Sequence, residues 1–150
     1  MLFCNIDLLD ENFHLKRGQY VGVKDGVIAY IGDTAPAEDY GESYDGRHRL
    51  LLPGLYNVHS HAPMTLLRGY AENLPLQRWL NEKVFPFEDK LSEEAAYCGT
   101  QLAIAEMLAS GTVSFTDMYF FLDGITKAIL ESGIKCNLSR GLTVFDDSDY

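Results

Sequence analysis

Two histidines stand two residues apart at the end of a short apolar run, and this feature constrains the chain more than any other. The run Leu50–Leu52 leads into a Pro-Gly step and then into residues 55–61, which end in His59 and His61. Side chains alternate between the two faces of a β-strand, so a strand over 55–61 presents both imidazoles on one face. Two imidazoles so placed can bind a single metal ion such as zinc, iron or nickel.

The residues around the histidine pair favour a buried strand. Leu50–Leu52 and Leu55 are apolar, and Pro63 ends the strand soon after the pair. Side chains at the carboxyl ends of buried parallel strands are where α/β proteins build their active sites. A catalytic metal site is therefore the leading interpretation, and two hydrogen-bonded core histidines are the alternative.

After residue 53 the sequence predicts strands that alternate with helices. Apolar spacing predicts a helix over 74–84, and Ser92 is a suitable N-cap for a second helix that ends near Ser110. The expected apolar stripe of this second helix comprises Ala95, Cys98, Leu102, Ala105 and Leu108. Further strands are expected over 113–118 and 135–144, with a helix over 125–131 between them. This alternation is typical of an α/β fold with a parallel sheet.

The first 52 residues have a different character and predict a small β unit. Strands over 20–23 and 27–31 flank Asp25-Gly26, a dipeptide that favours a tight hairpin because it tolerates positive φ. The chain is thus expected to divide into a β part over 1–52 and an α/β part over 53–150.

Composition excludes several classes of function. The net charge is −10 and the 12 Lys and Arg residues are scattered, which argues against a nucleic-acid partner. No apolar run reaches the length of a membrane span, and Asp7, Asp10 and Glu11 interrupt any signal peptide. The odd number of cysteines, 3, without a Cys-x-x-Cys pair, predicts reduced thiols and a cytoplasmic location.

The segment 52–61 resembles the first barrel strand of the amidohydrolase superfamily. Residues 62–69 are similar to the branch that contains 5-methylthioadenosine/S-adenosylhomocysteine deaminases and related chlorohydrolases, and the resemblance continues through 80–88, 115–119 and 139–142. It implies a (β/α)8 TIM-type barrel with a flanking β-sandwich to which the N-terminal strands contribute. A complete barrel needs about 250 residues, so the chain is interpreted as holding the first third of one.

The resemblance implies metal-dependent hydrolytic deamination of an adenine nucleoside: S-adenosylhomocysteine, 5′-methylthioadenosine or adenosine. His59 and His61 are the expected metal ligands, with zinc as the expected metal and iron or manganese compatible. Catalytic zinc usually has three protein ligands and an open position. The remaining ligands and the general acid are therefore expected beyond residue 150, and no catalytic residue is assigned within the chain.

Three residues are candidates for substrate binding, Glu88 and Arg140 by the same resemblance and Trp79 by its place after the first strand of the barrel part. Glu88 would accept hydrogen bonds from the ribose hydroxyls. Without the resemblance, the sequence indicates only a solvated charge at this position. Arg140 would bind the amino-acid carboxylate of S-adenosylhomocysteine, or else form a loop ion pair. Trp79 would form a wall of the nucleoside pocket, or else pack in the core.

Four other residues are expected to have structural or surface positions. Asp117 is expected to accept hydrogen bonds from nearby backbone, and Arg68 to pair with an acidic neighbour. His14 and His48 are expected on the surface.

The sequence is also compatible with other functions. They are another amidohydrolase reaction such as guanine deamination or triazine dechlorination, a phosphoesterase of the polymerase-and-histidinol-phosphatase type, and an inactive fragment or scaffold. The apolar stripe expected on the helix after Ser92 faces either a second subunit, as in a homo-oligomer, or further parts of a barrel.

Overall fold

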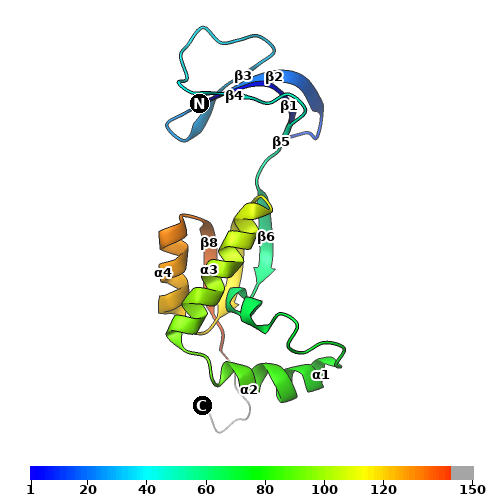
Figure 1. Ribbon diagram of the computed structural model, residues 1–150, viewed down its shortest axis with the longest axis vertical. Helices are drawn as coiled ribbons and strands as arrows, with labels where there is room; N and C mark the ends of the chain where they lie inside the picture. The colour runs from blue at the N-terminus through cyan, green and yellow to red at the C-terminus, as the bar shows by residue number, and fades with distance from the viewer. Residues whose placement is uncertain (143–150) are drawn as a thin grey trace. The chain divides into compact units, whose positions relative to one another are not determined.

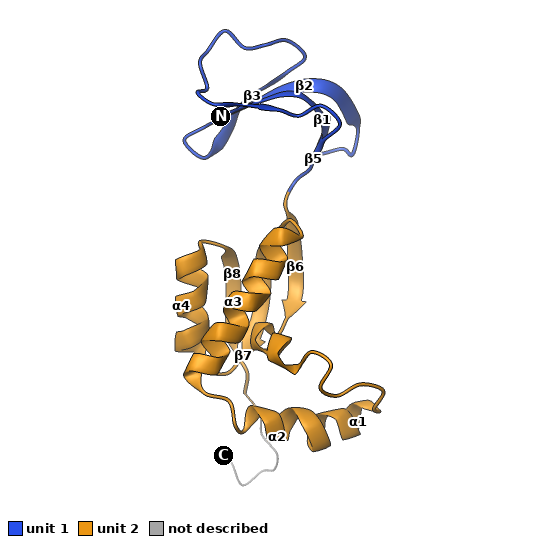
Figure 2. Cartoon of the chain, viewed as in Figure 1, with its two compact units in different colours: residues 1–53 blue, residues 54–150 orange. Residues whose placement is uncertain are grey.

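The computed structural model describes residues 1–142, which form two compact units (Figures 1 and 2). The first covers Met1–Pro53 and consists of β-strands, and the second begins at Gly54 and combines strands with helices. No helix in the described part of the chain is long and apolar enough to cross a membrane.

The first unit is a five-stranded mixed sheet. Its strands are β1 (Leu2–Leu9), β2 (Leu15–Lys24), β3 (Val27–Gly32), β4 (Ser43–Asp45) and β5 (Leu50–Leu51). β1 pairs antiparallel with β2, which pairs antiparallel with β3, while β4 and β5 both lie parallel to β1. The strand over Leu2–Leu9 was not among the sequence expectations, and it lies at the centre of the sheet.

The hairpin predicted at Asp25-Gly26 is confirmed. Both residues have positive φ, 51° at Asp25 and 77° at Gly26, and Lys24 pairs with Val27 across the turn. These are the backbone angles of a two-residue turn whose twist matches that of the flanking strands.

The second unit is an α/β fold around a three-stranded parallel sheet. Its strands are β6 (Leu55–Ser60), β7 (Thr112–Tyr119) and β8 (Lys135–Arg140), in the order β6-β7-β8. Helix α3 (Glu93–Ala109) is the last helix between β6 and β7, and helix α4 (Leu122–Ser132) connects β7 to β8. The two helices pack on each other and on the sheet, as Figure 1 shows. The predicted alternation of strands and helices is therefore confirmed.

The predicted start of α3 is confirmed, but the predicted apolar stripe is not the face that packs inward within the described residues. The hydroxyl of Ser92 accepts a hydrogen bond from the amide of Ala95 at 3.2 Å, as an N-cap should. Leu102 and Leu108 are 44% and 48% exposed, and the buried face instead comprises Ala96, Gly99, Thr100, Ala103 and Ile104. These side chains are small, which lets α3 approach its neighbours closely.

The helix expected over 74–84 runs instead from Leu76 to Glu88 and changes its hydrogen-bond register on the way. It consists of α1 (Leu76–Trp79), a π-helical turn (Leu80–Val84) and α2 (Phe85–Glu88). Pro86 has no amide hydrogen to donate to the preceding turn, and a π turn before it accommodates this loss. Because the helix continues past Pro86, Glu88 lies on its last turn rather than in a loop.

The third strand of the second unit is shorter than expected. β8 ends at Arg140, whereas the sequence predicted a strand as far as Val144. Residues 141 and 142 are not in a strand, and Val144 lies outside the described residues.

Candidate metal centre and ligand pocket

The structure brings the rings of His59 and His61 together at the end of β6. Their centroids are 5.0 Å apart and the planes are nearly perpendicular, at 81°. The pairing of β6 with β7 shifts register between Asn57 and Ser60, so simple alternation does not hold along this stretch. Such irregularities re-aim side chains and are common beside active sites.

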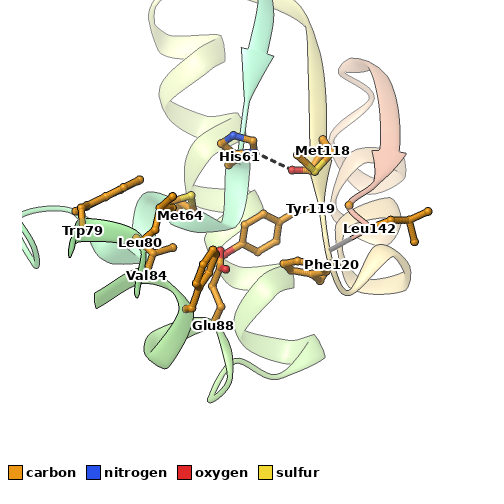
Figure 3. A pocket seen from close by; sticks show the side chains of 12 residues that line it. His61, Met64, Trp79, Leu80, Val84, Glu88, Met118, Tyr119, Phe120 and Leu142 are labelled. Carbon is orange, nitrogen blue, oxygen red and sulfur yellow. Dashed lines mark hydrogen bonds between the residues drawn. The ribbon is translucent and has the colours of Figure 1, made fainter. Parts of the chain in front are cut away.

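One ring of the pair is oriented by a hydrogen bond to the neighbouring strand. Nδ1 of His61 lies 2.8 Å from the carbonyl oxygen of Met118 in β7, as the dashed line in Figure 3 shows. A carbonyl oxygen only accepts, so Nδ1 carries the proton and donates it. Nε2 of His61 is then left with a free lone pair, which is the form of imidazole that binds a metal.

The donor chemistry of this pair suits a divalent metal, although two ligands do not complete a site. Zinc in catalytic sites usually takes three protein ligands. Within residues 1–142 no group of three or more His, Cys, Asp and Glu side chains is placed to share a metal. The described residues therefore supply two imidazoles that fit part of a ligand set.

Asp117 anchors the backbone that follows the histidine pair. Its side chain is fully buried, and its carboxylate accepts a hydrogen bond from the amide of Ala62 at 3.0 Å. The hydroxyl of Ser60 lies 3.2 Å from the same carboxylate and 2.9 Å from the carbonyl of Thr116. The predicted role of Asp117 in binding nearby backbone is confirmed, and its contacts hold the residues on both sides of His61.

The short 3-10 helix η1 (Ala62–Leu67) fixes the chain after His61 by packing closely on α3. A side chain at Gly99 would meet the carbonyl oxygen of Pro63 at 2.8 Å, so only glycine permits this approach. Thr65 donates to the carbonyl of Gly99 at 2.8 Å. Arg68 makes two 2.7 Å hydrogen bonds to Glu106, which confirms the predicted acidic partner.

A pocket of about 210 Å³ lies beside His61, between the end of the sheet and the helix over 76–88 (Figure 3). Three of the residues chosen from the sequence, His61, Trp79 and Glu88, line it together. The remaining lining residues are mostly apolar: Met64, Leu80, Val84, Phe85, Met118, Tyr119, Phe120, Gly141 and Leu142. Small-molecule sites combine an apolar wall with a few polar groups in this way.

Tyr119 is a pocket residue that the sequence reasoning missed. It ends β7, its side chain is 3% exposed, and its hydroxyl makes no hydrogen bond of ordinary length and angle with any described residue. Burial raises the pKa of Tyr119 well above its usual value, and the adjacent Glu88 carboxylate raises it further. The period-2 spacing of Phe115, Asp117 and Tyr119 in the sequence was the available signal, because residues two apart in a strand share a face, and the structure buries all three.

Arg140 lies apart from the other candidates. It is exposed at the end of β8 and lines a neighbouring hollow with Glu93, Phe121 and Asp123, among others. Glu93 accepts a hydrogen bond from the amide of Gly124 at the start of α4, so that carboxylate is already engaged. His14 and His48 are exposed in the first unit, as predicted.

Comparison with known proteins identifies relatives whose sequences are similar to that of this chain. The amidohydrolase family model matches residues 50–149. The 5-methylthioadenosine/S-adenosylhomocysteine deaminase of Syntrophomonas wolfei is 43% identical over 146 residues, which is 95% of this chain and 34% of the relative. The 5′-deoxyadenosine deaminase of Methanocaldococcus jannaschii is 46% identical over 133 residues, 87% of this chain and 32% of the relative. The chain thus spans about a third of the length of these relatives.

Solved structures share the fold. An adenosine deaminase from Xanthomonas campestris with bound zinc is 33% identical, with a TM-score of 0.73 over 90% of this chain and 32% of that one. The atrazine chlorohydrolase of Arthrobacter aurescens, complexed with zinc, has a TM-score of 0.87 over 99% of this chain and 37% of that one, at 18% identity. The matched family model and the similarity to these relatives show that the chain belongs to the amidohydrolase family.

Proposed function

We propose that the protein that carries this chain hydrolyses the exocyclic amine of an adenine nucleoside, giving the inosine analogue and ammonia. The observation that carries the proposal is the pocket in which His61, Trp79 and Glu88 meet, in a chain whose similar relatives are named as deaminases of 5-methylthioadenosine, S-adenosylhomocysteine and 5′-deoxyadenosine. The substrates proposed are S-adenosylhomocysteine, 5′-methylthioadenosine and adenosine.

In this proposal the sheet β6-β7-β8 is the start of a (β/α)8 barrel, and the strands of the first unit form part of a β-sandwich. The parallel order of the three strands and the helices between them support the barrel. The histidine pair and the pocket then lie at the carboxyl ends of the barrel strands, where enzymes of this fold bind their substrates.

His59 and His61 would hold the metal, for which we propose zinc. A bound divalent metal lowers the pKa of water to about 7 and so supplies hydroxide at neutral pH. The hydrogen bond from His61 to the Met118 carbonyl keeps that ring in the metal-binding tautomer. No general acid is assigned to the described residues.

The other pocket residues would bind and orient the nucleoside. Glu88 accepts hydrogen bonds from the ribose hydroxyls, because a carboxylate can take two such bonds at once. Trp79 offers an apolar wall, and Arg140 would reach the carboxylate of S-adenosylhomocysteine from the neighbouring hollow.

The free thiols of Cys4, Cys98 and Cys136 support a cytoplasmic location.

The first experiment is an ultraviolet assay of the complete gene product with S-adenosylhomocysteine, which follows the conversion of adenine to hypoxanthine. Conversion that a chelator abolishes and added zinc restores is expected. Metal binding without conversion of any adenine nucleoside would contradict the substrate class and favour another amidohydrolase reaction. Absence of both metal binding and conversion would favour an inactive scaffold.

A further inference from the structure

The hydroxyl of Tyr119 is a buried polar group left without a partner among the described residues. Tyr119 is only 3% exposed, and it is one of the residues that line the pocket. Leaving a buried hydroxyl unpaired is unfavourable, and native proteins do so rarely. Such an exception at a ligand pocket indicates a hydrogen bond that forms when the pocket is occupied.

The neighbouring group that can accept this bond is the carboxylate of Glu88. Figure 3 shows the ring of Tyr119 directed toward Glu88, which stands on the last turn of α2. A phenol hydroxyl is protonated at neutral pH, so Tyr119 can donate. An ionised carboxylate only accepts, and the two groups are therefore complementary.

The tyrosine ring is held in place, whereas Glu88 is only half-buried. The ring of Tyr119 packs on those of His61 and Phe120, with centroids 6.4 Å and 5.5 Å away, and it belongs to a core cluster with Ala96 and Ile125. The hydroxyl is thus a fixed donor, and the Glu88 side chain is the partner that adjusts to it.

We infer that Tyr119 is a positioning residue for Glu88: its hydroxyl donates to the Glu88 carboxylate when a nucleoside fills the pocket, and the remaining carboxylate lone pairs accept the vicinal hydroxyls of the ribose. A carboxylate has about four acceptor positions, which suffices for one tyrosine and two ligand hydroxyls. The inference rests on the proposed function, because it takes a ribonucleoside as the ligand. It makes Tyr119 a determinant of the preference for ribose over deoxyribose.

The test compares the binding of inosine and 2′,3′-dideoxyinosine by calorimetry, since these product-type ligands are not consumed. The proteins are the metal-loaded complete gene product and its Tyr119→Phe, Glu88→Ala and double variants. Tyr119→Phe should weaken inosine binding about tenfold and dideoxyinosine binding by less than about twofold. In the Glu88→Ala background, which has no side-chain acceptor at this position, Tyr119→Phe should change inosine binding by less than about twofold, because Tyr119 acts through the carboxylate.

Tyr97→Phe is the matched control. It removes the hydroxyl that donates from α3 to Glu131 of α4 at 2.6 Å, outside this pocket, and should leave both affinities unchanged. Thermal unfolding adds an independent reading: Tyr119→Phe should not lower Tm, because the hydroxyl it removes is unpaired in the free protein.

The outcomes separate the inference from the function on which it rests. Equal weakening of both ligands, an undiminished effect in the Glu88→Ala background, or a lowered Tm with unchanged ribose preference would overturn the positioning role alone. Failure of the unmodified protein to bind inosine would overturn the proposed nucleoside specificity, and the inference with it.

Discussion

Two exposed carboxylates of the first unit and two buried polar side chains of the second unit show different kinds of contact. In the first unit the carboxylates of Glu38 and Asp45 lie at the surface and pair with Lys24 and Arg47, whose hydrogen bonds hold the carboxylate pKa values below their usual range. In the second unit Asp117 is buried and binds groups more than 50 residues away in sequence. Tyr119 is buried as well, and its hydroxyl lacks a partner within residues 1–142.

The difference indicates which polar contacts the fold can lose and which contacts it depends on. Exposed pairs between near neighbours are replaceable, because water can solvate either partner. Buried groups that connect distant segments fix the geometry of a site, and a buried group without a partner is ready for one. The largest effects of substitution are therefore expected at the carboxyl ends of β6 and β7.

Loss of the proposed metal ligand His61 should have the largest effect. His61→Asn is expected to abolish stoichiometric metal binding and to lower deaminase activity by more than about 100-fold, since even residues that only orient metal ligands contribute about 10–100-fold. Elemental analysis and the ultraviolet assay measure the two effects. His14→Asn, an exposed histidine in the first unit, is the control. Full metal content in His61→Asn would show that the pair does not bind the metal.

Removal of the buried carboxylate should destabilise the second unit. Asp117→Ala leaves the amide of Ala62 without its acceptor and is expected to lower the free energy of unfolding by about 2–4 kcal/mol. Chemical denaturation measures this effect. Asp45→Ala in the first unit is the control, because its carboxylate is half exposed and pairs with the nearby Arg47. Equal effects of the two substitutions would remove the contrast between the units.

Loss of the Glu88 carboxylate should weaken binding of the sugar of the substrate rather than binding of its base. Glu88→Ala is expected to raise KM for adenosine about 10–100-fold, because hydrogen bonds to a charged group are strong, and to leave KM for free adenine unchanged. Steady-state kinetics on the two substrates give the ratio. Glu94→Ala, outside the pocket, is the control. Equal changes for nucleoside and base would refute a ribose contact.

The sequence predicted the parts of this structure that depend on local chemistry. The Asp25-Gly26 hairpin follows from positive φ, and the start of α3 follows from the Ser92 cap, so neighbouring residues were sufficient for both. The alternation of strands and helices followed in the same way from the periodicity of apolar residues. The adjacency of the His59 and His61 rings was also predictable, because they are only two residues apart.

Features that depend on distant contacts were not predictable in this way. The buried face of α3 is set by the close approach of Gly99 to Pro63, so the large apolar residues of the helix are not the ones that pack inward. The position of Tyr119 beside Glu88 depends on the helical continuation past Pro86, which local rules for proline do not suggest. Sequence reasoning therefore identified the histidine pair and missed the buried hydroxyl.

Arg140 provides a smaller test within the second unit, because it lies in a hollow next to the pocket and not in the pocket itself. Arg140→Met is expected to raise KM for S-adenosylhomocysteine about tenfold and to leave 5′-methylthioadenosine, which lacks the carboxylate, nearly unchanged. Kinetics with the two substrates decide the matter. Arg78→Met is the control, since Arg78 pairs with Glu82 outside the pocket lining. Identical changes on both substrates would rule out a carboxylate contact by Arg140.

The smallest effect is expected in the first unit, at the surface pair of Arg47 and Asp45. Arg47→Ala removes hydrogen bonds of 2.8 and 3.1 Å from Arg47 Nε to the two oxygens of Asp45, yet both side chains are half exposed or more. Water replaces the lost contacts, so Tm should change by less than about 2 °C and activity should not change. Calorimetric unfolding at low and at high salt measures this, and the small difference from the unmodified protein should vanish at high salt. A loss as large as that of Asp117→Ala would mean that the first unit also depends on individual polar contacts, and that burial does not distinguish the two units.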